Sequence, residues 1–169
     1  MRKPWIKILF ASSLAVALVL ATGFNASAWS NHDQEITGTW TVTVQLNNCS
    51  GAAIGGPFQS LLTFAGDETM IEDTSNPGFA AGQRGTGHGV WEYKGHRTYV
   101  VKSIAFINFT TPPAPPSPGF TAGTQTIGQT VEFNGGPDQW TSDAKVTFAD
   151  ASGQIYRQAC AAATANRFE

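Results

Sequence analysis

The sequence predicts an all-β domain, an antiparallel up-and-down barrel of about eight strands. Three observations predict this fold class. Ser, Thr, Gly and β-branched or aromatic residues dominate, whereas strong helix formers at helical spacing are scarce. Segments in which polar and apolar residues alternate recur along the chain. Turn-forming residues separate most of these segments by the short distances typical of hairpins.

The N-terminal segment is typical of a secretory signal peptide. Three basic residues among the first seven precede an apolar run from Ile8 to about Gly23, and the small-residue sequence Ala26-Ser27-Ala28 follows. Because the apolar run is short for a membrane span, we expect cleavage after Ala28 and no membrane span afterwards. We therefore expect a bacterial-type protein that is exported to the periplasm or secreted.

Composition limits the partners of the remaining 141 residues. Three of the 10 Lys and Arg residues lie in the signal segment, which leaves 7 against 12 Asp and Glu and a formal net charge of −5. A chain with this excess of negative charge is a poor candidate for binding nucleic acid or anionic lipid surfaces, so we expect neither as a partner. The length suits one domain, which we place at residues 37–169 after a flexible N-terminus at 29–36.

The first strand has the strongest pattern. Thr39 to Leu46 alternates strictly, with Trp40, Val42, Val44 and Leu46 on one face and polar residues on the other. The further expected strands are 58–64, 69–73, 86–93, 96–109, 120–133, 139–148 and 154–163. We expect tight turns at Gly66-Asp67 and at Lys94-Gly95. Segments 47–57, 74–85 and the Pro-rich 112–118 are expected to be long connections.

Cys49 and Cys160 are expected to form a structural disulfide. Export places them in an oxidising compartment, and neither has a His or a second Cys at metal-ligand spacing. The bond would bring the first and last strands together, which favours a closed barrel without edge strands.

Gly38-Thr39-Trp40 at the start of the first strand resembles the Gly-x-Trp signature of the lipocalins and the wider calycin group. The resemblance implies an eight-stranded barrel that holds a small ligand, and it implies that Arg167 packs across Trp40 to close one end. The chain lacks the Thr-Asp-Tyr-type motif of that family. Barrels of the allene oxide cyclase and dirigent type remain an alternative.

No motif for catalysis, phosphate binding or cofactor binding is present, and three scattered His residues do not suggest a metal site, so we expect no cofactor. His88 lies between Gly87 and Gly89, which suits either a site or a rim position. The carboxylate pairs Asp67-Glu68 and Glu72-Asp73 border a hairpin, and we expect them to be solvated turn charges. Three charged residues within strands are expected to face outward: Lys102, Glu132 and Arg157.

Three functions therefore remain open. The favoured one is a small-molecule binding barrel with an apolar or amphipathic ligand, entered between the loops at 74–89 and 112–119. The candidate ligand-binding residues are Trp40, Val42, Val44, His88, Trp91 and Phe106. The alternatives are a cyclase or isomerase enzyme and a structural or interaction protein with a filled barrel. A cavity would separate the first two from the third, and polar groups converging inside it would favour the enzyme.

Overall fold

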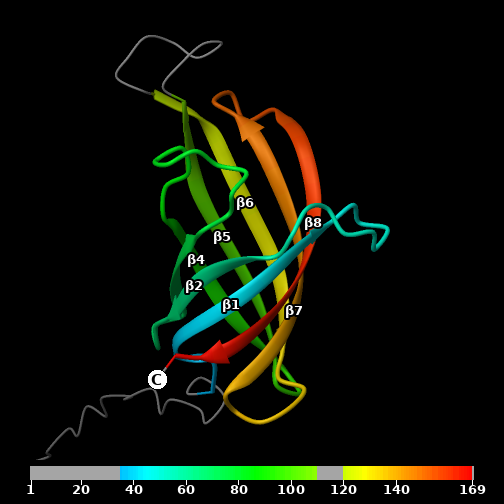
Figure 1. Ribbon diagram of the computed structural model, residues 1–169. Helices are drawn as coiled ribbons and strands as arrows, with labels where there is room; N and C mark the ends of the chain where they lie inside the picture. The colour runs from blue at the N-terminus through cyan, green and yellow to red at the C-terminus, as the bar shows by residue number, and fades with distance from the viewer. Residues whose placement is uncertain (1–34, 110–119, 169) are drawn as a thin grey trace, which may run out of the picture.

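The computed structural model describes residues 35–109 and 120–168, and these form a closed barrel of eight antiparallel strands (Figure 1). Each strand pairs with its neighbours in sequence, and β1 pairs with β8. The predicted all-β class and barrel are thereby confirmed. The strands are β1 (Gly38–Asn47), β2 (Phe58–Phe64), β3 (Thr69–Thr74), β4 (Gly87–Gly95), β5 (Thr98–Phe109), β6 (Phe120–Glu132), β7 (Gln139–Asp150) and β8 (Ile155–Arg167).

Closure depends on the pairing of β1 with β8, which runs from Trp40 opposite Arg167 to Asn47 opposite Cys160. The Cys49–Cys160 disulfide joins the connection that follows β1 to this same strand, across 111 positions of sequence. The bond predicted from the sequence is therefore present. Closure covers only part of the longer strand: β8 pairs with β1 from Cys160 to Arg167, whereas its first residues, 155–159, pair with β7 alone.

The alternation of β1 places its apolar residues inside the barrel. Trp40 and Val42 are buried, and Val44 is half-buried against the same interior cluster. The outward residues Thr39 and Thr43 instead make hydrogen bonds across the outer surface of the sheet, to side chains of β2. The pattern of β1 thus tells which of its faces lies inside, because a slip by one residue would turn its apolar side chains outward.

Aromatic side chains fill one end of the barrel, which we call the closed end. Trp40 packs against Phe133 and Trp140 with ring centroids 5.6 and 5.9 Å apart, and Tyr99 packs against Phe133 at 5.7 Å. All four are buried. Glu35 and Ile36, which we expected within the flexible N-terminus, lie at this end with helical backbone, and Ile36 is fully buried.

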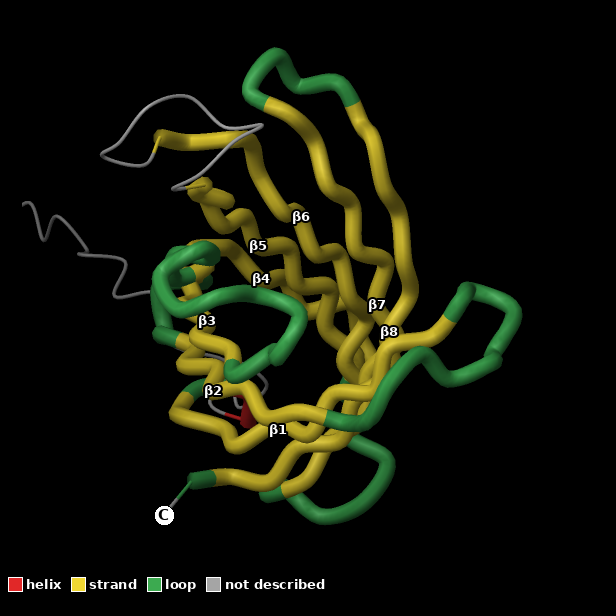
Figure 2. The backbone as a smooth tube through the Cα atoms, turned by 45° about the horizontal axis from the view of Figure 1, so that its top comes forward, coloured by secondary structure: helices red, strands yellow, loops and turns green. Residues whose placement is uncertain are grey.

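The opposite end, which we call the open end, has walls of unequal height. Strands β5 to β8 have 12 or 13 residues, whereas β2 and β3 have 7 and 6. Figure 2 shows β6, β7 and β8 rising well above β1, β2 and β3. The segment between β3 and β4 lies against β5. The Gly85 N–H donates to the carbonyl of Phe106, and the Asn108 N–H donates to the carbonyl of Gln83.

One predicted turn is displaced. We expected Lys94-Gly95 between β4 and β5, but Gly95 belongs to β4 and the turn is His96-Arg97. Both turn residues have positive φ, 51° and 59°, although neither is Gly. Gly95 instead lies at a register shift in the β4–β5 pairing, so this glycine serves a bulge rather than the turn centre.

Several sequence predictions fall on residues outside the described part of the chain. These are the signal peptide at 1–28 and the Pro-rich segment at 112–118. Within residues 35–109 and 120–168, no helix has the length and apolar character needed to cross a membrane.

Candidate functional site

The closed end is sealed by Arg167 over Trp40. The guanidinium carbon lies 4.3 Å from the centroid of the indole ring, and the indole Nε1 donates to the carbonyl of Ile36 at 2.8 Å. Gly38 adopts a φ of +125°, and a Cβ there would lie 2.9 Å from Arg167 Nη1. The glycine of the Gly-x-Trp sequence is therefore needed both for its backbone conformation and for the space that Arg167 occupies. The contact expected from the lipocalin resemblance is present.

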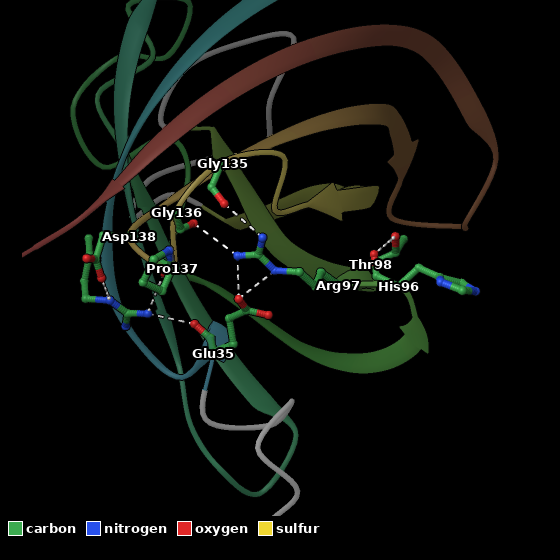
Figure 3. Close-up of polar contacts among 9 residues, drawn as sticks. Glu35, His96, Arg97, Thr98, Gly135, Gly136, Pro137 and Asp138 are labelled. Atoms are coloured by element: carbon green, nitrogen blue, oxygen red, sulfur yellow. Dashed lines mark hydrogen bonds and ion pairs between the residues drawn. The ribbon is translucent and has the colours of Figure 1, made fainter.

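A layer of polar contacts covers this end (Figure 3). Arg167 donates to Asp138 Oδ1 at 2.8 Å and to the carbonyls of Thr37 and Glu35, each at 2.8 Å. Arg97 pairs with Glu35 at 2.6 Å and donates to the carbonyl of Gly135 at 2.9 Å. The hydrogen bond from Arg97 to Glu35 raises the pKa of Arg97. These contacts fasten the segment before β1, the end of β8 and the β6–β7 turn over the aromatic cluster, which leaves the open end as the route to the interior.

The interior toward the open end contains a cavity of about 60 Å³. Its wall is mainly apolar, and it begins above the buried side chains of Val42 and Leu62. Phe79, from the segment between β3 and β4, lines it and packs near Phe148 with ring centroids 6.4 Å apart. The apolar lining residues are Val42, Val44, Leu46, Phe58, Leu62, Phe79, Ile127, Ala144, Val146, Ala161 and Ala163, and the polar ones are Ser60, Glu72, Thr74, Asn76, Gln125 and Gln129.

A buried ion pair lies beside this cavity. Arg84 Nη2 donates to Glu72 Oε1 at 3.0 Å, and the two side chains are 4% and 9% exposed. Glu72 Oε2 accepts a hydrogen bond from Ser103 Oγ at 3.1 Å. Arg84 Nε donates to Gln125 Oε1, and Arg84 Nη1 donates to the carbonyl of Gly85 at 3.1 Å. Each charge therefore has several partners, which is what a buried pair requires to offset desolvation.

Strand geometry explains how this pair forms. Glu72 shares the inward face of β3 with Met70, since alternate residues of a strand point to the same side. Arg84 precedes β4 but is already paired with Ile107 of β5, so its backbone continues the sheet. Gly87 supplies the room: a Cβ at this position would lie 3.1 Å from Glu72 Oε2 and 3.3 Å from Arg84 Nη2.

The structure separates the candidate ligand-binding residues into three groups. Val42 and Val44 line the cavity, whereas Trp40 and Trp91 are buried in the aromatic core below it. His88 and Phe106 are exposed on the outer surface, with 62% of Phe106 accessible. They do not face the cavity, because His88 and Phe106 follow the outward parity of β4 and β5.

The charges that face the interior differ from those expected. Glu72 was expected to be a solvated turn charge, and this is wrong, because its position on β3 turns it inward to Arg84. Lys102, Glu132 and Arg157 are exposed, as predicted. The glycines around His88 were a signal for a site, but the relevant one is Gly87, which makes room for Glu72 and Arg84 rather than exposing His88.

No known protein-family model matches this chain, and no curated protein matches its sequence. Among the residues that the structure describes, no group of three or more His, Cys, Asp or Glu side chains is placed to hold a metal ion.

Proposed function

We propose that this protein binds a small molecule with an apolar body in the cavity of its barrel. One observation carries the proposal: the interior is filled with aromatic side chains at the closed end but hollow and mainly apolar toward the open end. A barrel with a purely structural role would be packed throughout, since protein interiors leave few voids larger than a water molecule. The few polar groups in an otherwise apolar wall are typical of ligand sites.

The cavity limits the size of the part that is held inside. Its volume of about 60 Å³ exceeds the roughly 10–15 Å³ that one water molecule needs, but it is far below the roughly 300–1,000 Å³ of pockets for drug-sized ligands. A short aliphatic molecule, or the end of a longer one that projects through the open end, fits this volume.

We also propose that the protein works outside the cytoplasm. The support is the signal-like segment that ends at Ala28 together with the Cys49–Cys160 bond, since disulfides persist mainly in oxidising compartments. The intact mass of protein isolated from its natural source should correspond to a chain that starts at Trp29. A mass that includes residues 1–28 would contradict cleavage.

The binding proposal is tested by native mass spectrometry of protein purified from its natural source. A mass excess that is absent after denaturation is expected, and its fragmentation identifies the molecule. Protein that carries nothing, and that takes up nothing from a lipid and metabolite extract of the same source, would contradict the proposal.

A pair of neighbouring alanines provides a matched test of where the molecule binds. Ala163 lines the cavity, whereas Ala162 is exposed on the outer face of the same strand. Ala163→Phe should fill the cavity and abolish the mass excess, and Ala162→Phe should leave it unchanged. Equal retention by the two variants would place binding elsewhere.

An enzyme of the cyclase or isomerase kind is a second candidate. The observation that favours it is the convergence of polar groups at the cavity wall, where Arg84 holds both Glu72 and Gln125. A carboxylate held beside a bound molecule can take up and return a proton. If the molecule is a substrate, the wild-type protein should convert it to an isomer over time while Glu72→Gln binds it without conversion. Stable binding by both proteins would leave binding as the function.

A further inference from the structure

The charges around the cavity balance one another. Glu72 is the one charged residue that lines the cavity within the described part of the chain, and Arg84 neutralises it from behind at 3.0 Å. A ligand with a net charge would bring an additional ion into this apolar space without a counter-ion. Burying an unpaired charge is unfavourable, so the site disfavours both anions and cations.

Arg84 also fixes which atoms face a ligand. A guanidinium has donors only, so the Gln125 atom bonded to Arg84 Nε must be the carbonyl oxygen. The amide nitrogen of Gln125 then remains as a donor, and it makes no hydrogen bond within the described residues. The orientation of this side chain follows from chemistry alone.

Glu72 provides the matching acceptor. Each of its carboxylate oxygens accepts one hydrogen bond, from Arg84 or from Ser103, and a carboxylate oxygen has lone pairs for two. Arg84 bonds Gln125 through Nε and Glu72 through Nη2, and these two nitrogens lie on the same edge of its guanidinium. The side chains of Glu72 and Gln125 are therefore held next to each other. The cavity wall thus presents an adjacent acceptor and donor.

From this arrangement we infer that the ligand is an uncharged molecule whose apolar body carries one alcohol or amide group, which donates to Glu72 and accepts from Gln125. A carboxylate has no proton to donate to Glu72, and an ammonium has no lone pair to accept from Gln125. This inference rests on the proposed binding function and names the ligand class for the same cavity.

A series of four-carbon compounds tests the head group at constant body size. Butanol, butanamide, butyrate and butylammonium are titrated at pH 7 into isotopically labelled wild-type protein, and chemical-shift changes give each Kd. Butanol and butanamide should bind at least tenfold more tightly than butyrate and butylammonium. Xenon has no head group but enters apolar cavities, so its binding shows whether the cavity is accessible.

Two glutamine variants locate the contact. Gln125→Leu removes the donor at the cavity wall, whereas Gln158→Leu makes the same change at an exposed position of β8. The first should weaken butanamide and butanol binding about three- to tenfold, the loss expected for one hydrogen bond, and the second should have no effect. The wild-type series remains decisive if Gln125→Leu does not fold.

The outcomes distinguish the two proposals. Butyrate or butylammonium binding as tightly as butanol would overturn the inference about the ligand class and leave the binding function standing. The same holds if xenon enters the cavity but none of the four compounds binds. If xenon is also excluded, the cavity is not available and the binding function fails with it.

Discussion

Two arginines make the central polar contacts at two different levels of the barrel. Arg167 covers Trp40 at the closed end, and Arg84 reaches the wall of the cavity from the segment between β3 and β4. The sequence predicted the first, because the Gly-x-Trp resemblance names both partners. It did not predict the second, because the burial of Arg84 depends on Glu72 and Gln125, which are 12 and 41 positions away. The inward position of Glu72 was missed as well, because the sequence places this residue near a hairpin, where charged side chains are usually solvated.

The contact between Trp40 and Arg167 leads to a test of stability. Trp40→Ala should lower the free energy of unfolding by about 3–5 kcal/mol, as a truncation of a fully buried aromatic side chain. A double-mutant cycle with Arg167→Ala, followed by urea unfolding, should give a coupling energy of about 0.5–2 kcal/mol between the two residues.

The control is Arg157, whose guanidinium carbon lies 5.5 Å from the centroid of the Phe148 ring at an exposed position. Arg157→Ala should change stability by no more than about 0.5 kcal/mol. A coupling energy near zero for Trp40 and Arg167 would show that the seal depends on the hydrogen bonds of Arg167 rather than on the indole.

At the level of elements, strand positions were predictable and strand ends were less so. Alternation gave β2 without error, but β8 extends to Arg167, four residues beyond the expected end. Its last residues alternate only weakly, with the small Ala163 and Ala165 inside and Thr164 and Asn166 outside, and they pair with β1 and β7. Similarly, His96 and Arg97 form a turn at positive φ that local propensity assigns to the adjacent glycine.

The turn between β7 and β8 makes stability depend on pH. Asp150 accepts from the Ser152 hydroxyl at 2.6 Å and from the backbone N–H of Gln154 at 2.9 Å. The Ser152 side chain, followed by the Gln154 backbone, lowers the pKa of Asp150. A lowered folded-state pKa means that the stabilisation is present above the unfolded pKa and is lost as pH falls through the folded value.

Replacing this carboxylate should flatten that dependence. Asp150→Asn is expected to reduce the loss of unfolding free energy as pH falls below about 4, measured by urea unfolding at a series of pH values. Asp143→Asn, at an exposed position on the outer face of β7, is the matched control. A pH profile that Asp150→Asn leaves unchanged would show that the turn carboxylate does not contribute.

At the scale of the whole molecule, the sequence predicted that the barrel is closed but left open whether it contains a cavity. The disulfide pairing and the strand count follow from the two cysteines and the hairpin rhythm. The cavity arises instead because small residues, Ala144, Ala161 and Ala163, meet inside the tall wall of β7 and β8. Which small residues oppose one another depends on register between strands, and that is not readable from any one of them.

The disulfide should provide a large part of the stability. Because it closes a loop of 111 residues, its loss is expected to lower the free energy of unfolding by about 4–5 kcal/mol in the chain-entropy model. Urea unfolding with and without a reductant measures this difference. The Cys49→Ser/Cys160→Ser variant should match the reduced protein and respond no further to reductant, whereas equal midpoints for oxidised and reduced wild type would contradict the expected contribution.

The seal at the closed end also determines where other domains can be attached. Arg167 contacts the carbonyls of Thr37 and Glu35, so the first and last described residues of the barrel are neighbours. A tag or domain fused there would stand on the side away from the cavity, and a surface-tethered barrel would present its open end to solution. Because residues 35 and 168 lie close together, a short linker between them should allow a circular permutant of the barrel. New ends opened at an exposed turn, such as 151–154, would leave every strand with the same neighbours.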